Sequence, residues 1–103
     1  MDARALRTAT ADRARRTAEL IALCRSPTAR GSETILALSD ARARLDEATR
    51  AHAAEVRVLG VPRAEAMRAL RAELAAVDSG DLPEFGLVCD EVVSRFLAAL
   101  DAA

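Results

Sequence analysis

The 103-residue chain contains no tyrosine, no tryptophan and no lysine, and Phe85 and Phe96 are its only aromatic residues. Its large apolar residues are mostly leucine, so it offers little of the aromatic and β-branched material typical of sheets. Many of the remaining apolar residues are alanine, which favours helices but contributes little buried area. We therefore expect an all-α fold with a modest core.

Long apolar runs are also missing. No run approaches the roughly 18 residues of a membrane-spanning helix, and the N-terminus lacks the apolar stretch of a secretion signal. Two cysteines, Cys24 and Cys89, are too few for a disulfide scaffold, and each lies among apolar residues where a buried thiol is expected. The use of arginine alone for all 15 basic residues indicates a GC-rich genome. These features predict a cytoplasmic bacterial protein with no membrane partner.

The motifs of catalysis are absent as well. The sequence has no phosphate-binding glycine loop, no paired catalytic carboxylates and no nucleophile motif. His52 is the only histidine, and it shows no metal-ligand spacing with either cysteine. We expect no enzyme activity, no cofactor and no metal. His52 is interpreted as a packing residue, with a pH-sensitive contact as the alternative.

Apolar periodicity predicts one domain over residues 1–103, built as a small antiparallel bundle of three to four helices. Several breaks divide these helices. Ser32 is placed to cap the second helix, Gly60 to end it, and Pro62 to open the third at its first helical position. Asp2 and Pro83 mark the starts of the first and fourth helices. The expected helices cover residues 2–25, 33–59, 62–77 and from 83 onward.

Two helices show clear apolar faces. The second has a heptad seam in which three of eight positions are polar. The seam consists of Ile35, Leu38, Arg42, Leu45, Thr49, His52, Val56 and Leu59. The fourth has the widest apolar stripe in the chain, more than its neighbours should cover, so we expect a homodimer. The residues expected in the core or at the dimer interface are Val88, Val92, Phe96 and Leu100.

Charge is unevenly distributed along the chain, although the net charge is only −1. The first 31 residues are basic and the last 24 are acidic. Residues 1–19 have few large apolar side chains, which predicts a loosely packed or mobile basic arm. An acidic protein surface is a possible partner for this arm, through Arg13, Arg15 and Arg16.

The stretch around Gly60 is similar to the joint of a DNA-binding helix-turn-helix over residues 52–74. In that interpretation Arg63, Glu65 and Arg68 would face the DNA, and the two arginines would contact nucleic acid. Ala66 and Ala69 stand where that motif places branched apolar side chains, and the preceding helix is too long. A plain helical hairpin is therefore preferred.

The sequence thus predicts a small non-catalytic interaction or regulatory module that acts through protein–protein contacts. The alternative is a DNA-binding transcriptional regulator that uses residues 52–74. A weaker third hypothesis is ligand binding in a cavity between helices lined by alanine.

Overall fold

The computed structural model describes residues 3–25, 32–77 and 85–102, and all the regular structure in these ranges is helical. The predicted all-α fold is therefore confirmed for this part of the chain. Four helices follow one another: α1 (Arg4–Arg25), α2 (Ser32–Leu59), α3 (Arg63–Ala75) and α4 (Phe85–Asp101). The expected caps Asp2 and Pro83 lie outside the described residues.

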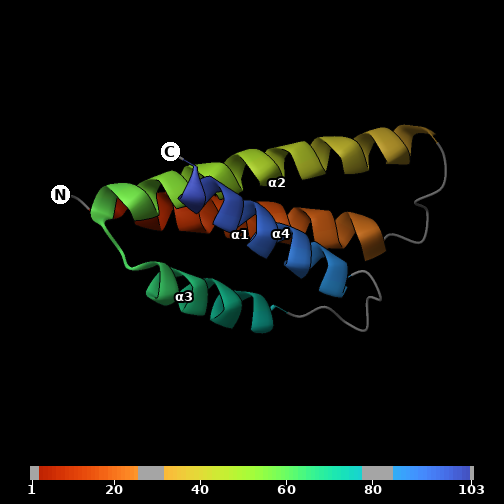
Figure 1. Cartoon of the computed structure of the whole chain (residues 1–103). Coiled ribbons are helices and arrows are strands. Elements are labelled where there is room, and N and C mark those ends of the chain that lie inside the picture. The colour runs from red at the N-terminus through yellow and green to blue at the C-terminus, as the bar shows by residue number, and fades with distance from the viewer. Residues whose placement is uncertain (1–2, 26–31, 78–84, 103) are drawn as a thin grey trace.

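The four helices alternate in direction, as expected for an antiparallel bundle (Figure 1). α1 and α2 pack side by side along most of their length, and α4 packs across α2. α3 lies on the other side of α4 from α2, and its backbone approaches α4 more closely than it approaches α1 or α2. The molecule measures 45 × 23 × 23 Å. The 28-residue α2 spans about 42 Å at 1.5 Å per residue, so this helix sets the long dimension.

The core lies where the other helices meet α4. Phe96 has no exposed surface, and Val88 and Val92 are nearly as well buried. The same apolar cluster takes side chains from the other three helices. It includes Leu20, Ile21, Leu45, Val56, Leu70 and Leu74. One chain therefore covers the centre of the wide apolar face on α4 without a second copy.

The turn between α2 and α3 is closed by backbone hydrogen bonds. Gly60 has a φ of +69°, which an L side chain rarely adopts, so a glycine is needed here. Its amide donates to the carbonyl of Arg57 and the amide of Val61 donates to that of Val56, a pattern known as the Schellman motif. Pro62 is the N-cap of α3 rather than its first helical residue, because its ψ of 140° is extended rather than helical. The helix therefore begins one residue later than predicted.

The predicted seam of α2 is buried in its second half only. Leu45, Thr49, His52 and Val56 are buried, whereas Ile35 is 68 % exposed and Arg42 is also exposed. The first turns of α2 extend beyond the ends of α1 and α4, so these helices cannot cover them (Figure 1).

Candidate functional site

The most distinctive group of side chains is a buried polar cluster formed by Arg13 of α1, His52 of α2 and Glu73 of α3. The Arg13 side chain has no exposed surface. Its Nε donates a hydrogen bond to His52 Nδ1 at 3.1 Å, and its Nη2 forms an ion pair with Glu73. Nη1 lies 3.5 Å from the hydroxyl oxygen of Thr17, one turn along α1. One guanidinium therefore joins three helices.

The protonation states in this cluster follow from burial. Burial, and after it the positive charge of Arg13, lowers the pKa of His52 to about 4. His52 is therefore neutral near pH 7. Since Nδ1 accepts from Arg13, the ring hydrogen lies on Nε2. Burial lowers the pKa of Arg13 to about 10, which leaves its charge in place. His52 also packs on Phe96, with ring centroids 4.7 Å apart.

This arrangement is suited to structure rather than to acid–base chemistry. A histidine with a pKa of about 4 is a poor base at neutral pH, and its Nδ1 is already occupied by Arg13. Burial, and after it the charge of Asp90, raises the pKa of the Cys89 thiol, which disfavours the nucleophilic thiolate. No cluster of three or more potential metal ligands occurs within residues 3–25, 32–77 and 85–102.

The residues expected in the core or at a dimer interface divide into two groups. Val88, Val92 and Phe96 are at most 3 % exposed and belong to the core of one chain, the first of the two places expected for them. Leu100 is only partly buried and lies at the edge of the core.

The arginines predicted to contact a partner are also separated by the structure. Arg13 is not on a surface at all, because it lies inside the bundle against His52 and Glu73. Arg15 is exposed and pairs with Asp12, and Arg16 is half-buried and pairs with Glu19. Residues 4–19 of the predicted basic arm lie within α1. The side chains of Arg13 and Thr17 are buried, so this part of α1 packs against the rest of the bundle.

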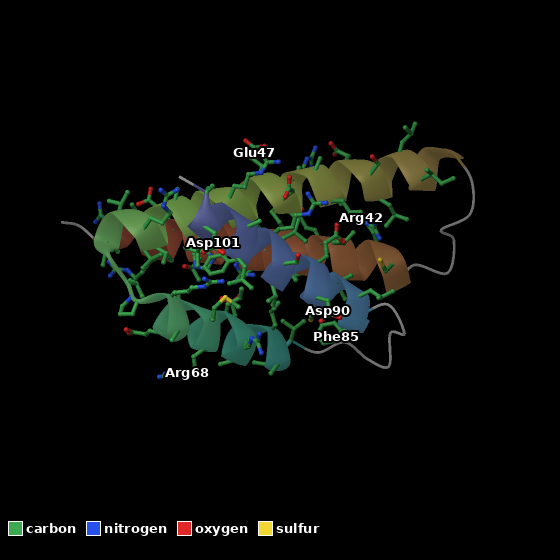
Figure 2. All side chains as sticks on the ribbon, in the orientation of Figure 1. Arg42, Glu47, Arg68, Phe85, Asp90 and Asp101 are labelled. Atoms are coloured by element: carbon green, nitrogen blue, oxygen red, sulfur yellow. The ribbon has the colours of Figure 1, made fainter. Side chains whose placement is uncertain are left out.

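The segment that resembles a helix-turn-helix folds as two helices joined by the short turn at Gly60. α3 runs in the opposite direction to α2 (Figure 1). Arg63 forms an ion pair with Asp101 of α4, at 3.2 Å. Arg68 is exposed and points away from the other helices (Figure 2). Both predicted arginines are therefore exposed, and Arg63 differs from Arg68 in its ion pair with α4.

A second candidate site is apolar and lies where α2 extends past its neighbours. Ile35 and Leu36 are 68 % and 69 % exposed, and Leu38 is partly buried. We call these three residues the α2 start surface. Two shallow hollows flank it. The larger, of about 580 Å³, includes Leu23, Ala37 and Ala41, and the smaller, of about 350 Å³, is lined by Ile35, Leu38, Ser39 and Arg42.

Apolar periodicity could not identify the polar cluster because the seam of α1 is itself half polar. Leu6, Thr10, Arg13, Thr17, Leu20 and Cys24 repeat by four and three residues, as a heptad seam does. The polar positions of this seam face the polar positions of the α2 seam at Arg13 and His52. The sequence did indicate this contact in one way, because polar residues interrupt the heptad seams of both α1 and α2.

None of the described helices is long and apolar enough to cross a membrane. The chain matches no protein-family model, no curated protein and no solved structure. Its function is therefore inferred from its own contacts, charges and exposed surfaces.

Proposed function

We propose that the protein is a small non-catalytic interaction module that pairs with a second copy of itself through the α2 start surface. The observation that carries this proposal is the exposure of Ile35 and Leu36 at about two-thirds of their surface. Exposed apolar side chains that form one contiguous patch mark interaction sites. Leu87, in the first turn of α4, is also 70 % exposed.

The shape of this surface favours a copy of the same chain as the partner. Ile35 and Leu36 are exposed on α2, and the next residue along the helix, Ala37, lines a hollow together with Leu23. Under twofold symmetry, a projection and a neighbouring hollow on one chain meet the hollow and the projection of the other. Each contact is then made twice, which doubles the apolar area that a small patch can bury.

The charges around the surface are compatible with this pairing. Asp40 and Arg44 line the rim of the larger hollow and form an ion pair 2.9 Å long, so that part of the rim is neutralised within one chain. Arg42 lies on the side of α2 that faces α4 (Figure 2), where it adds a single positive charge. A patch of three large side chains falls short of the roughly 1,600 Å² of a standard interface. The dimer should therefore be weak, with a dissociation constant in the micromolar range or above.

The other hypotheses have less support. An acidic partner would have to compete with Asp12 and Glu19 for Arg15 and Arg16. DNA recognition over residues 52–74 is disfavoured by Ala66 and Ala69, which stand where a helix-turn-helix places branched apolar side chains. The neutral His52 offers no base for catalysis at pH 7. We place the protein in the reducing cytoplasm, because its two cysteines form no disulfide.

Light scattering during size-exclusion chromatography tests the proposal directly. The wild-type mass should rise with concentration from 10.9 kDa toward twice that value. The double variant Ile35→Gln, Leu36→Gln should stay monomeric, because glutamine keeps the helix but removes the apolar contact. Val58→Gln is the matched control: Val58 is 62 % exposed at the other end of α2 and should leave the dimer unchanged.

Two results would contradict the proposal. One is a wild-type chain that stays monomeric at millimolar concentration. The other is a dimer that the double variant leaves intact, which would place the interface elsewhere. Circular dichroism of each variant should be unchanged, since both sites are exposed.

A further inference from the structure

A groove of about 250 Å³ lies between α1, α2 and α3, toward the C-terminal end of α2. Leu6 and Thr10 line it from α1, and His52 and Val56 from α2. Val61 closes it at the turn, and α3 contributes the remaining wall. The α3 residues are Glu65, Ala66, Ala69, Leu70 and Glu73. The groove is thus separate from the α2 start surface, which lies at the other end of α2.

The groove exists because α3 presents small side chains at this level. Ala66 and Ala69 face the space where larger apolar residues would close the contact between α3 and the α1–α2 pair. Across the groove from this wall, α1 and α2 contribute Leu6 and Val56. The result is a hollow with apolar walls and few polar groups, which is the usual composition of a small-molecule site.

The polar groups of the groove favour a donor or a cation. Glu65 and Glu73 bring two carboxylates to the α3 wall. Arg13, which neutralises part of the charge on Glu73, is buried and already bound to Thr17, His52 and Glu73, so an anion cannot reach it. With Arg13 included, this group of charges sums to −1. His52 is itself almost fully buried, at 7 % exposure, and its neutral ring keeps its hydrogen on Nε2.

We propose that this groove binds a small molecule with an apolar body of about one ring and a protonated primary amine. The apolar body would lie against Val56, Ala66 and Ala69, and the ammonium group would lie at the carboxylate of Glu65, because Glu73 is already paired with Arg13. An engineered cavity of about 150 Å³ is large enough to hold benzene. A groove of about 250 Å³ therefore accommodates a ring with a short aminomethyl arm.

Three probes of nearly the same shape separate the effect of charge from that of size: benzylamine, benzyl alcohol and benzoate. Titrations followed by two-dimensional amide NMR should shift the amides around His52, Ala66 and Ala69. Benzylamine should bind with a millimolar dissociation constant, as expected for so few atoms. Benzyl alcohol should bind several-fold more weakly, and benzoate should show no binding.

Two variants test the location. Ala69→Leu should abolish benzylamine binding by filling the groove, while Ala72→Leu is the matched control. Ala72 is exposed on the same helix and does not line the groove, so this variant should bind like wild type. Glu65→Gln should weaken benzylamine about three- to fivefold and leave benzyl alcohol unchanged.

Several outcomes would overturn the inference. Equal affinity for benzylamine and benzyl alcohol would show that the carboxylate of Glu65 does not recognise the ligand. Preference for benzoate would reverse the predicted charge. Binding that survives Ala69→Leu, or no binding by the wild-type chain, would remove the groove as a site. None of these results depends on oligomeric state, so this test and that of the proposed dimer fail independently.

Discussion

Replacement of Arg13 by methionine should be the most damaging change to a charged residue in this protein. Methionine keeps much of the length of the side chain but removes every polar contact. The loss includes the ion pair with Glu73, whose side chain is 32 % exposed, and the hydrogen bond to His52. It leaves the Nδ1 of His52 buried without a donor.

The magnitude follows from these contacts. A buried acceptor without a partner costs about 1–3 kcal/mol, and breaking a fully buried ion pair costs about 3–5 kcal/mol. Because Glu73 keeps partial access to water, the loss of its ion pair with Arg13 should cost less than the roughly 3–5 kcal/mol of a fully buried pair. We expect Arg13→Met to lower the free energy of unfolding by about 2–4 kcal/mol. For a domain of this size, the melting temperature should fall by roughly 10–30 °C.

Urea unfolding followed by far-ultraviolet circular dichroism measures this change, since a chain without tyrosine or tryptophan offers little intrinsic fluorescence. Arg15→Met on the exposed side of α1 is the control and should leave the midpoint unchanged. The triple variant Arg13→Met, His52→Leu, Glu73→Met should recover most of the loss, because no polar partner is left unsatisfied. An Arg13→Met midpoint equal to that of wild type would refute the proposed role of the cluster.

Four further outcomes are expected. The unfolded chain protonates His52 near pH 6.5, whereas the folded chain does so only near pH 4. The free energy of unfolding should therefore keep its full value above pH 6.5 and fall by up to about 3 kcal/mol as the pH is lowered to 4. In acid titrations the variant His52→Gln should not show this part of the loss. Gly60→Ala should cost about 1 kcal/mol in urea unfolding, because its φ is +69° and no atom lies within 4 Å of an added Cβ; an unchanged midpoint would contradict the turn. Phe96→Ala should cost about 3–5 kcal/mol, since the ring is fully buried; a melting curve close to wild type would contradict its place in the core. Hydrogen exchange should find residues 10–20 of α1 protected, because Arg13 and Thr17 are buried there; rapid exchange would favour the mobile arm.

The positions at which helices end and begin could be predicted because they depend on local backbone chemistry. Gly60 ends α2 because glycine alone adopts positive φ without strain, and α3 begins at Arg63, within one residue of the predicted start at Pro62. The apolar face of α4 was equally clear, and its centre is the core. These features can be predicted without knowing which residues from other helices contact them.

The candidate sites could not be predicted in the same way because they depend on what each residue meets. Arg13 resembles any surface arginine until α2 brings His52, and α3 brings Glu73, to its guanidinium. Ile35 fits the seam of α2 perfectly, yet it is exposed because α1 and α4 end before they reach it. Periodicity gives the direction of a side chain, whereas the lengths of neighbouring helices decide whether it is covered.

The contact between Arg13 and His52 also selects one alignment of α1 against α2. A slide of one helix by seven residues would keep the seam positions of α1 and α2 facing each other, so heptad spacing alone does not select one alignment. The same slide would move Arg13 from His52 to the level of Leu45 or Leu59 and bury its charge against a hydrocarbon side chain. The polar pair thus penalises shifted pairings far more than it stabilises the native one. In a chain with so few large apolar residues of distinctive shape, this penalty gives the helical hairpin a unique register.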